Sequence, residues 1–459
     1  MIKNLCAFAL GVCLLAAVAN KAQPERTFKS PEIYEFSKRI ADISTDKIWP
    51  GFDFQNYTRL RGDHLDFSDD PENTSSEAFS WKLADPYFKE LGLEEDLVIT
   101  FHEAFHGFER DAKRKGGKWG AENSMLVFEY QESSARNNAL FAIESRLLRL
   151  ALESKGKSDL KEKVRQFLGV RLLRQAEIDP RFVEFEKGAE LNEGLAEYAG
   201  TQAVVRGILS KHTSIPFTEA DADAFLSKKY SMLDTIGQIG NNIRRKFYYT
   251  GSAEGFLLDR MMPEWKTKVQ MDNATLQGLL AASIGKLPQS KEVNSFLTKY
   301  GYEKILGAEE VAVAQKKIEH QALLDKTLNQ KGRRYVIDYS ALAKPGGIRS
   351  FDPMNVTMID TKMRVHTRSV TFASADGFTA AFSQPVIEDL DNRRYTTVIP
   401  ETEHETIKID GVEIDPSLVV NTRTFKTIEI AAANFKLQAK NGSIIIGNKE
   451  VAIKLLEHY

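Results

Sequence analysis

Two histidines and a glutamate at fixed spacing are the residues of this chain most suited to chemistry. They lie in the stretch VITFHEAFHGF, residues 98–108. His102 and His106 are four residues apart, so on a helix their imidazoles lie on one face, one turn from each other. Two imidazoles placed in this way can bind one metal ion, and Glu103 can take a proton from a bound water molecule. The stretch therefore carries the HExxH pattern of metal-dependent hydrolysis.

Aromatic residues surround this pattern. Phe101, Phe105 and Phe108 recur at helical spacing, which predicts that the helix is packed in a core. A buried His-Glu-His set needs a partner such as a metal ion, because burial without one is costly. The alternative, a helix with two surface histidines, conflicts with these aromatic neighbours.

The third metal ligand is expected to be a carboxylate. A third histidine in the metzincin arrangement requires Gly at 109 and His at 112, where this chain has Glu109 and Ala112. Downstream, FEKGAELNEGLAEYAGTQAVV (residues 185–205) offers several carboxylates at helical spacing. The last two lie among small residues, which allow close approach of another helix, whereas the first two could equally form a solvated face. These four residues are Glu186, Glu190, Glu193 and Glu197.

HEAFH followed by LNEGLAEY resembles the gluzincin metallopeptidases, in particular the aminopeptidase N and thermolysin-like groups. NEGLA is similar to the segment that supplies the glutamate ligand of zinc in the aminopeptidase N family. The resemblance implies that His102, His106 and Glu193 bind Zn²⁺, with Glu190 as the alternative to Glu193. It also implies that Glu197 hydrogen-bonds one of the two histidines and so orients it.

A second segment also resembles the aminopeptidase N relatives. YYTGSA (residues 248–253) is similar to their Y-x-K-G-A segment, in which the tyrosine hydroxyl donates to the oxyanion. The register selects Tyr248, with Tyr249 as the alternative, and Thr250 stands in place of the lysine. Such a donor contributes roughly 3 kcal/mol to transition-state binding. Two aromatic residues that simply pack the start of a helix are the other interpretation.

Together these parts predict an exported, zinc-dependent peptidase that acts on peptides or proteins. Zn²⁺ would lower the pKa of a water molecule, and Glu103 would remove its proton and pass it to the leaving amine. Two other functions stay open. One is a non-peptidase zinc hydrolase, and the other is a catalytically silent secreted binding protein with a structural zinc.

The composition limits the partners and the compartment. A net charge of −2 over 459 residues gives no basic excess for nucleic acid. Residues 1–22 combine Lys3, an apolar run and small residues, which predicts a secretory signal. The run is shorter than the ~20 residues of a membrane span, so no stable span is expected after cleavage. Cys6 and Cys13 lie inside this signal, and a cysteine-free mature chain favours a periplasmic or secreted location.

The elements that must position the site are mainly helical. Residues 23–333 are predicted to form a helical zinc-metallopeptidase domain with a small sheet, and residues 334–459 a β-rich C-terminal domain. In the second domain, Asp410-Gly411 and Asn441-Gly442 predict two-residue hairpin turns. Helical periodicity covers 137–154, 160–176, 188–209, 254–262, 274–285 and 305–332.

Overall fold

The computed structural model describes residues 28–457 apart from short internal segments. The predicted signal, residues 1–22, lies outside the described residues, as do both cysteines. The described residues form two compact units that divide between Val313 and Ala314. The segments left out are 73–78, 82–91, 118, 120–121, 124–125, 128, 131–133, 212–213, 220, 238–242, 344–346, 353–354 and 376.

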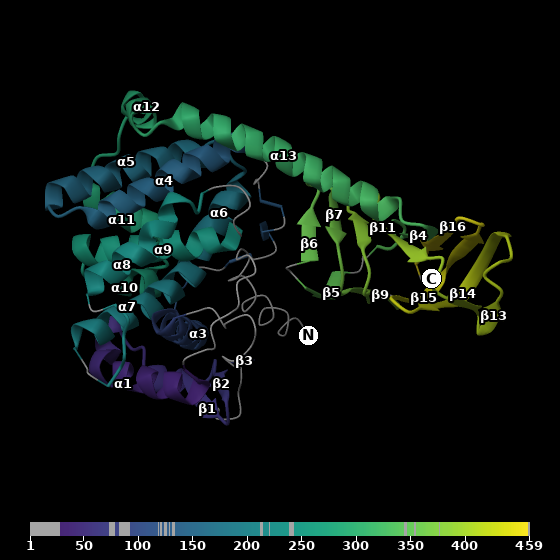
Figure 1. Ribbon diagram of the computed structural model, residues 1–459, viewed down its shortest axis with the longest axis horizontal. Coiled ribbons are helices and arrows are strands. Elements are labelled where there is room, and N and C mark those ends of the chain that lie inside the picture. Colours follow the sequence, from purple (N-terminus) through teal and green to yellow (C-terminus); the bar gives the residue numbers. More distant parts are fainter. Residues whose placement is uncertain are drawn as a thin grey trace. The chain divides into compact units, whose positions relative to one another are not determined.

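The first unit is built from helices and one small sheet (Figure 1). Among its described residues, three antiparallel strands follow the order β1 (Thr58–Arg61), β2 (His64–Phe67) and β3 (Phe79–Trp81). Its helical elements are α1 (Ser30–Ile48), α2 (Phe54–Tyr57), α3 (Leu93–Arg114), α4 (Ala135–Glu153), α5 (Lys157–Gln175), α6 (Pro180–Ala189), η3 (Glu190–Gly194), α7 (Leu195–Leu209), α8 (Ala222–Tyr230), η4 (Ser231–Asp234), α9 (Ile243–Met261), α10 (Trp265–Asp272), α11 (Leu276–Ile284), α12 (Ser290–Lys299) and α13 (Tyr302–Leu328), which continues into the second unit.

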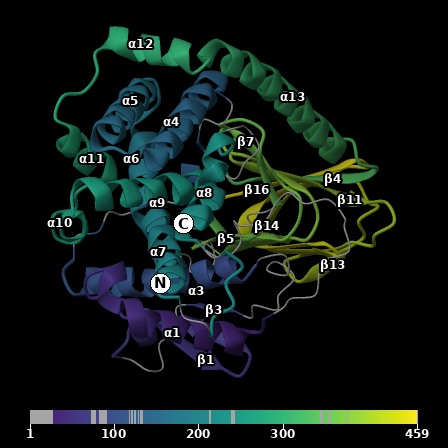
Figure 2. The ribbon, with the colours of Figure 1, turned by 60° about the vertical axis from the view of Figure 1, so that its left-hand side comes forward.

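Helix α3 is buried on two faces, and each face has its own partners. Its aromatic face packs into a cluster in which Phe105 contacts Trp49 and Phe52, with ring centroids 5.3 Å apart in both pairs. Phe101 packs on Phe54 at 4.5 Å. The face that carries the two histidines is turned toward α7, because His102 contacts Glu197 there. Helix α7 lies beside α3 (Figure 2). The aromatic contacts thus fix α3 in the core and leave its polar face for the site.

Small residues let the site helices approach closely. A Cβ added to Gly200 on α7 would lie 2.2 Å from the backbone oxygen of Val98 on α3. A Cβ added to Gly194 would lie 2.6 Å from Cα of Gly251 on α9. Backbone meets backbone at both points, so α7 is packed against α3, and η3 against α9, through glycine.

The second unit is β-rich. Among its described residues, 13 strands form one sheet, whose main path is β13-β12-β14-β15-β16-β4-β11-β10-β7-β6, with β9 also paired to β15 and β8 joining β9 to β5. The strands are β4 (Gly332–Asp338), β5 (Gly347–Phe351), β6 (Val356–Met358), β7 (Met363–His366), β8 (Val370–Ser374), β9 (Phe378–Phe382), β10 (Val386–Asp389), β11 (Arg394–Pro400), β12 (Thr406–Ile409), β13 (Val412–Ile414), β14 (Val420–Ala432), β15 (Phe435–Ile446) and β16 (Glu450–Leu455).

The predicted fold class, mainly α with a small sheet and then a β-rich region, is confirmed. The Asp410-Gly411 turn is also confirmed, because it joins β12 to β13 and both residues have positive φ. Asn441-Gly442 is not a turn but lies within β15. A Cβ at Gly442 would meet the Phe425 ring at 2.5 Å, so this glycine serves close packing. The last predicted helix ends at Leu328 rather than Gly332.

Among the described residues, no helix combines the length and the apolar character that crossing a bilayer requires.

Candidate metal centre

Three buried side chains bring one ligand atom each to a common point. Nε2 of His102 lies 3.0 Å from Nε2 of His106, and Oε2 of Glu193 lies 3.4 Å from each of them. The histidines are 3% and 2% exposed, and Glu193 is fully buried. Oε2 of Glu193 has no hydrogen-bond partner among the described residues. A buried carboxylate oxygen without a donor, facing two imidazole nitrogens, fits a metal ion, so this group could bind one.

The other nitrogen of each imidazole is held by a carboxylate. Nδ1 of His102 lies 3.2 Å from Oε2 of Glu197, and Nδ1 of His106 lies 3.0 Å from Oε2 of Glu109. If each Nδ1 carries the proton, it donates to the carboxylate, and Nε2 is left as the ligand atom. Glu197 thus makes the predicted contact with a histidine, and that histidine is His102. The equivalent contact of Glu109 to His106 was not predicted.

A buried lysine completes the contacts of Glu197. Nζ of Lys229, on α8, lies 2.7 Å from Oε1 of Glu197 and 3.2 Å from both oxygens of Glu95. Burial opposes ionisation of Glu197, but Lys229 and His102 outweigh it and lower the pKa of Glu197 to about 2. Glu197 is therefore an anion that faces His102 with one oxygen and Lys229 with the other.

The second oxygen of Glu193 faces a cation as well. Oε1 accepts a hydrogen bond from Arg244 on α9 at 2.5 Å. Burial opposes its charge, but Arg244 and the two imidazoles hold the pKa of Glu193 well below its usual range. Burial opposes the charged form of His102 too, yet Glu193 and Glu197 raise its pKa to about 10. The surroundings thus favour positive charge where the three ligand atoms meet.

Glu103 lies beside this point without belonging to the three ligands. Its Oε1 is 4.0 Å from Nε2 of His102, and the residue is 6% exposed. Burial raises the pKa of Glu103, against the charges of the two histidines. A carboxylate with a raised pKa next to a metal position has the placement of a general base.

The four glutamates predicted at helical spacing, Glu186, Glu190, Glu193 and Glu197, fall into two groups. Residues 190–194 form a π-helical turn, η3, whose extra residue changes the direction of the side chains that follow it. Glu193 and Glu197 face the histidines. Glu190 instead accepts hydrogen bonds from Arg171 at 2.8 and 3.1 Å and from Thr250 at 2.7 Å, so it does not face the histidines.

Glu186 and Glu190, the first two of these four glutamates, are not solvated. Glu186 is 2% exposed and accepts two hydrogen bonds from Arg174. Glu190 is 3% exposed and pairs with Arg171. The solvated-face interpretation is therefore wrong for both, because two arginines of α5 are buried next to them.

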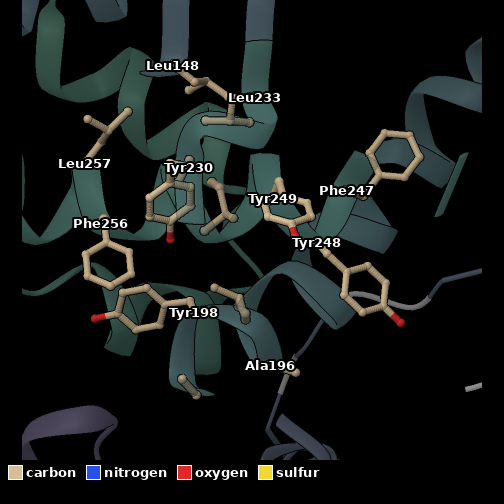
Figure 3. Close-up of a cluster of buried hydrophobic side chains, with 14 of the residues drawn as sticks. Leu148, Ala196, Tyr198, Tyr230, Leu233, Phe247, Tyr248, Tyr249, Phe256 and Leu257 are labelled. Carbon is tan, nitrogen blue, oxygen red and sulfur yellow. The ribbon is translucent and has the colours of Figure 1, made fainter. Parts of the chain in front are cut away.

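Of the two candidate tyrosines, Tyr248 lies beside the histidines. Its ring stacks on that of His102 with centroids 5.2 Å apart and planes 14° apart. Tyr249 has its ring near Lys229 and Arg245 instead. Figure 3 shows the two rings leaving α9 in different directions, with the hydroxyl of Tyr248 pointing away from the rings of Tyr198 and Phe256.

Comparison with known proteins adds no family to this geometry. No protein-family model matches the chain, and no curated protein or solved structure matches it. The chemistry of the site therefore follows from its own residues. These are three convergent ligand atoms, a carboxylate beside them, and two carboxylates behind the imidazoles.

Proposed function

We propose that this chain is an exported zinc-dependent peptidase of the gluzincin type. The observation that supports it best is the spacing of the three ligand atoms, at 3.0, 3.4 and 3.4 Å. Metal–ligand distances of ~2.0–2.2 Å in a tetrahedral zinc site put the ligand atoms roughly 3.3–3.6 Å apart, close to these values. Two imidazoles and one carboxylate also suit zinc better than magnesium or calcium, which prefer oxygen ligands throughout.

Three protein ligands would leave a bound zinc ion with one open position, and the ion would supply acidification of a water molecule and polarisation of a carbonyl group. Glu103, whose carboxylate lies 4.0 Å from Nε2 of His102, is the proposed acceptor of the water's proton and would then pass this proton to the leaving amine. Glu197 and Glu109 hold the imidazoles in orientation. Tyr248, stacked on His102, is the proposed donor to the carbonyl oxygen as negative charge develops there.

Peptides or proteins are the proposed substrates, because the HExxH pattern and the downstream glutamate resemble those of peptidases. Export is proposed from the signal-like residues 1–22.

The test is the Glu103→Gln variant. It should keep the zinc content of the wild type, measured by elemental analysis, because Glu103 is not among the three ligands. Cleavage of a peptide library should fall by roughly 10²–10⁴-fold. Undiminished turnover would refute the role of Glu103 as base. Cleavage of small esters or epoxides with peptides left intact would indicate another zinc hydrolase. A tightly bound zinc with no hydrolysis by the wild type would indicate a structural metal.

A further inference from the structure

Arg244 is the least expected residue of the metal centre. It lies on α9, is 4% exposed, and donates from a terminal nitrogen to Oε1 of Glu193 at 2.5 Å. Oε1 is the oxygen that does not face the imidazoles. The two oxygens of Glu193 thus have separate surroundings, one with a guanidinium and the other with two histidines.

The guanidinium of Arg244 is itself fixed from the other side. Its Nε donates to Oε1 of Glu122 at 3.0 Å, and the terminal nitrogen that contacts Glu193 lies 2.9 Å from Oε2 of Glu122. Asn192 closes the ring, since its amide donates to Oε2 of Glu122 at 3.0 Å and to Oε1 of Glu193 at 3.3 Å. Because Arg presents planar donors in a fixed fork, this ring leaves Arg244 little freedom to turn.

We propose that Arg244 is a positioning residue that makes Glu193 bind the metal through Oε2 alone. A carboxylate can bind a metal through one oxygen or through both. The charge-assisted hydrogen bond from Arg244 to Oε1 competes with binding through both oxygens, because Oε1 would have to lose its contact with this buried cation to bind the metal. One-oxygen binding keeps the coordination number low and leaves a position for water or substrate. The inference rests on the proposed metal centre, but not on which bond the protein hydrolyses.

Glu197 shows the same division of its oxygens. Oε2 faces His102, and Oε1 lies 2.7 Å from the buried ammonium of Lys229. Each of the two carboxylates of η3 and α7 therefore meets a histidine with one oxygen and a buried cation with the other. This repetition indicates that cations fix the carboxylate orientations on both sides of His102.

Cobalt-substituted protein tests the proposal, because the visible absorption of Co²⁺ reports its coordination number. Arg244→Gln should weaken Co²⁺ and Zn²⁺ binding by roughly 10–100-fold, measured by competition with a chelator. Its cobalt spectrum should also move from a four-coordinate toward a five-coordinate form, as Oε1 joins the metal. Arg244→Lys restores a cation at the site and should recover most of the affinity.

Arg245→Gln is the matched control, because the neighbouring Arg245 contacts Tyr249 and not Glu193. It should leave affinity and spectrum unchanged. If Arg244→Gln does not fold, Glu122→Gln tests the same idea, since it keeps Arg244 but loosens it, and should shift the cobalt spectrum in the same direction. Wild-type spectra and affinities in Arg244→Gln, or in Glu122→Gln where only that variant folds, would overturn the inference. A wild-type protein that binds no divalent metal would overturn the proposed metal centre itself.

Discussion

Gly200 on α7 lies directly against the backbone carbonyl of Val98 on α3. A Cβ at position 200 would be 2.2 Å from that oxygen, far inside van der Waals contact. His102 follows Val98 by one helical turn, and Glu197 precedes Gly200 by about one turn. The contact between these two backbones therefore sets how closely Glu197 can approach His102.

Gly200→Ala should move α7 away from α3. The added methyl group has no room, so we expect a loss of about 1–3 kcal/mol in the free energy of unfolding. Metal affinity should fall as well, because the hydrogen bond between His102 and Glu197 lengthens. Thermal unfolding with and without zinc measures both effects.

Gly307→Ala is the control for that variant. Gly307 lies inside α13, and a Cβ there would meet nothing within 4 Å. Alanine should therefore stabilise the protein slightly, by roughly 0.4–1 kcal/mol. Equal effects of the two substitutions would show that the contact between Gly200 and Val98 does not restrict the helices.

Glu197→Gln should weaken metal binding by roughly 10–100-fold, as is typical for residues that orient a histidine ligand. The amide cannot supply the negative charge that His102 and Lys229 both contact. Chelator competition measures the affinity. Glu184→Gln is a suitable control, because Glu184 is exposed on α6 and pairs only with Lys187 among the described residues. If Glu197→Gln bound zinc as the wild type does, the orienting role would be excluded.

The histidine pair could be predicted from the sequence because its chemistry depends on local spacing. One helix is enough to put His102 and His106 on one face. The approach of Glu193 could be anticipated from the small residues around it, since Gly194 and Gly200 predict close helix packing. In both cases the pattern lies within a few residues of the chain.

The partners that complete the site could not be predicted in the same way. Arg244 and Lys229 are each surrounded by other charged residues in the sequence, and nothing local distinguishes a buried cation from a surface one. Their roles depend on which helix passes beside them after folding. The contact of Glu109 with His106 is different, because a carboxylate three residues after a histidine lies on the same helical face. That signal was present in the sequence.

Tyr248→Phe should reduce the proposed peptidase activity, mainly in kcat. Loss of one oxyanion donor typically costs roughly 10²–10³-fold. The ring of phenylalanine keeps the stack on His102, so zinc content and stability should change little. Tyr249→Phe is a matched control, since its hydroxyl lies 3.5 Å from Arg245 and its ring does not stack on either histidine. A greater loss of kcat in Tyr249→Phe would reverse the assignment.

Arg171→Met should destabilise the first unit strongly. Arg171 is 1% exposed and hydrogen-bonds three buried glutamates, Glu144, Glu190 and Glu254. Removing the shared cation takes a buried charged partner away from each of the three carboxyl groups, at a cost of about 3–5 kcal/mol.

Arg165→Met, on the same helix, is the control for Arg171→Met. Arg165 pairs with Glu162 and Glu292 at partly exposed positions, and such pairs contribute below about 1 kcal/mol. Urea unfolding of both variants, followed by the circular dichroism of the helices, gives the comparison. Similar losses in the two variants would contradict the importance of the buried cluster.

The β-rich unit should lose stability in acid, because protonation of Glu388 weakens its contacts with two neighbouring side chains. Glu388 lies on β10, is 4% exposed, and accepts hydrogen bonds from Arg364 at 2.9 Å and from His366 at 3.0 Å, both on the neighbouring β7. Burial opposes its ionisation, but these partners lower the pKa of Glu388 below its ordinary value. A lowered pKa stabilises the folded state at pH values above the unfolded-state pKa of Glu, which is about 4.3. This stabilisation is lost as the pH falls through the pKa of Glu388 in the folded state.

Hydrogen exchange of the peptides that cover β7 and β10 measures this loss, because it follows these strands separately from the helical unit. Protection in the wild type should decrease between pH 5 and roughly pH 3, after correction for the intrinsic exchange rate. Glu388→Gln should be less protected than the wild type at pH 7 and should change less with acid. Glu429→Gln, exposed on β14, should follow the wild type at every pH. Equal acid sensitivity in Glu388→Gln and the wild type would mean that another group carries the effect.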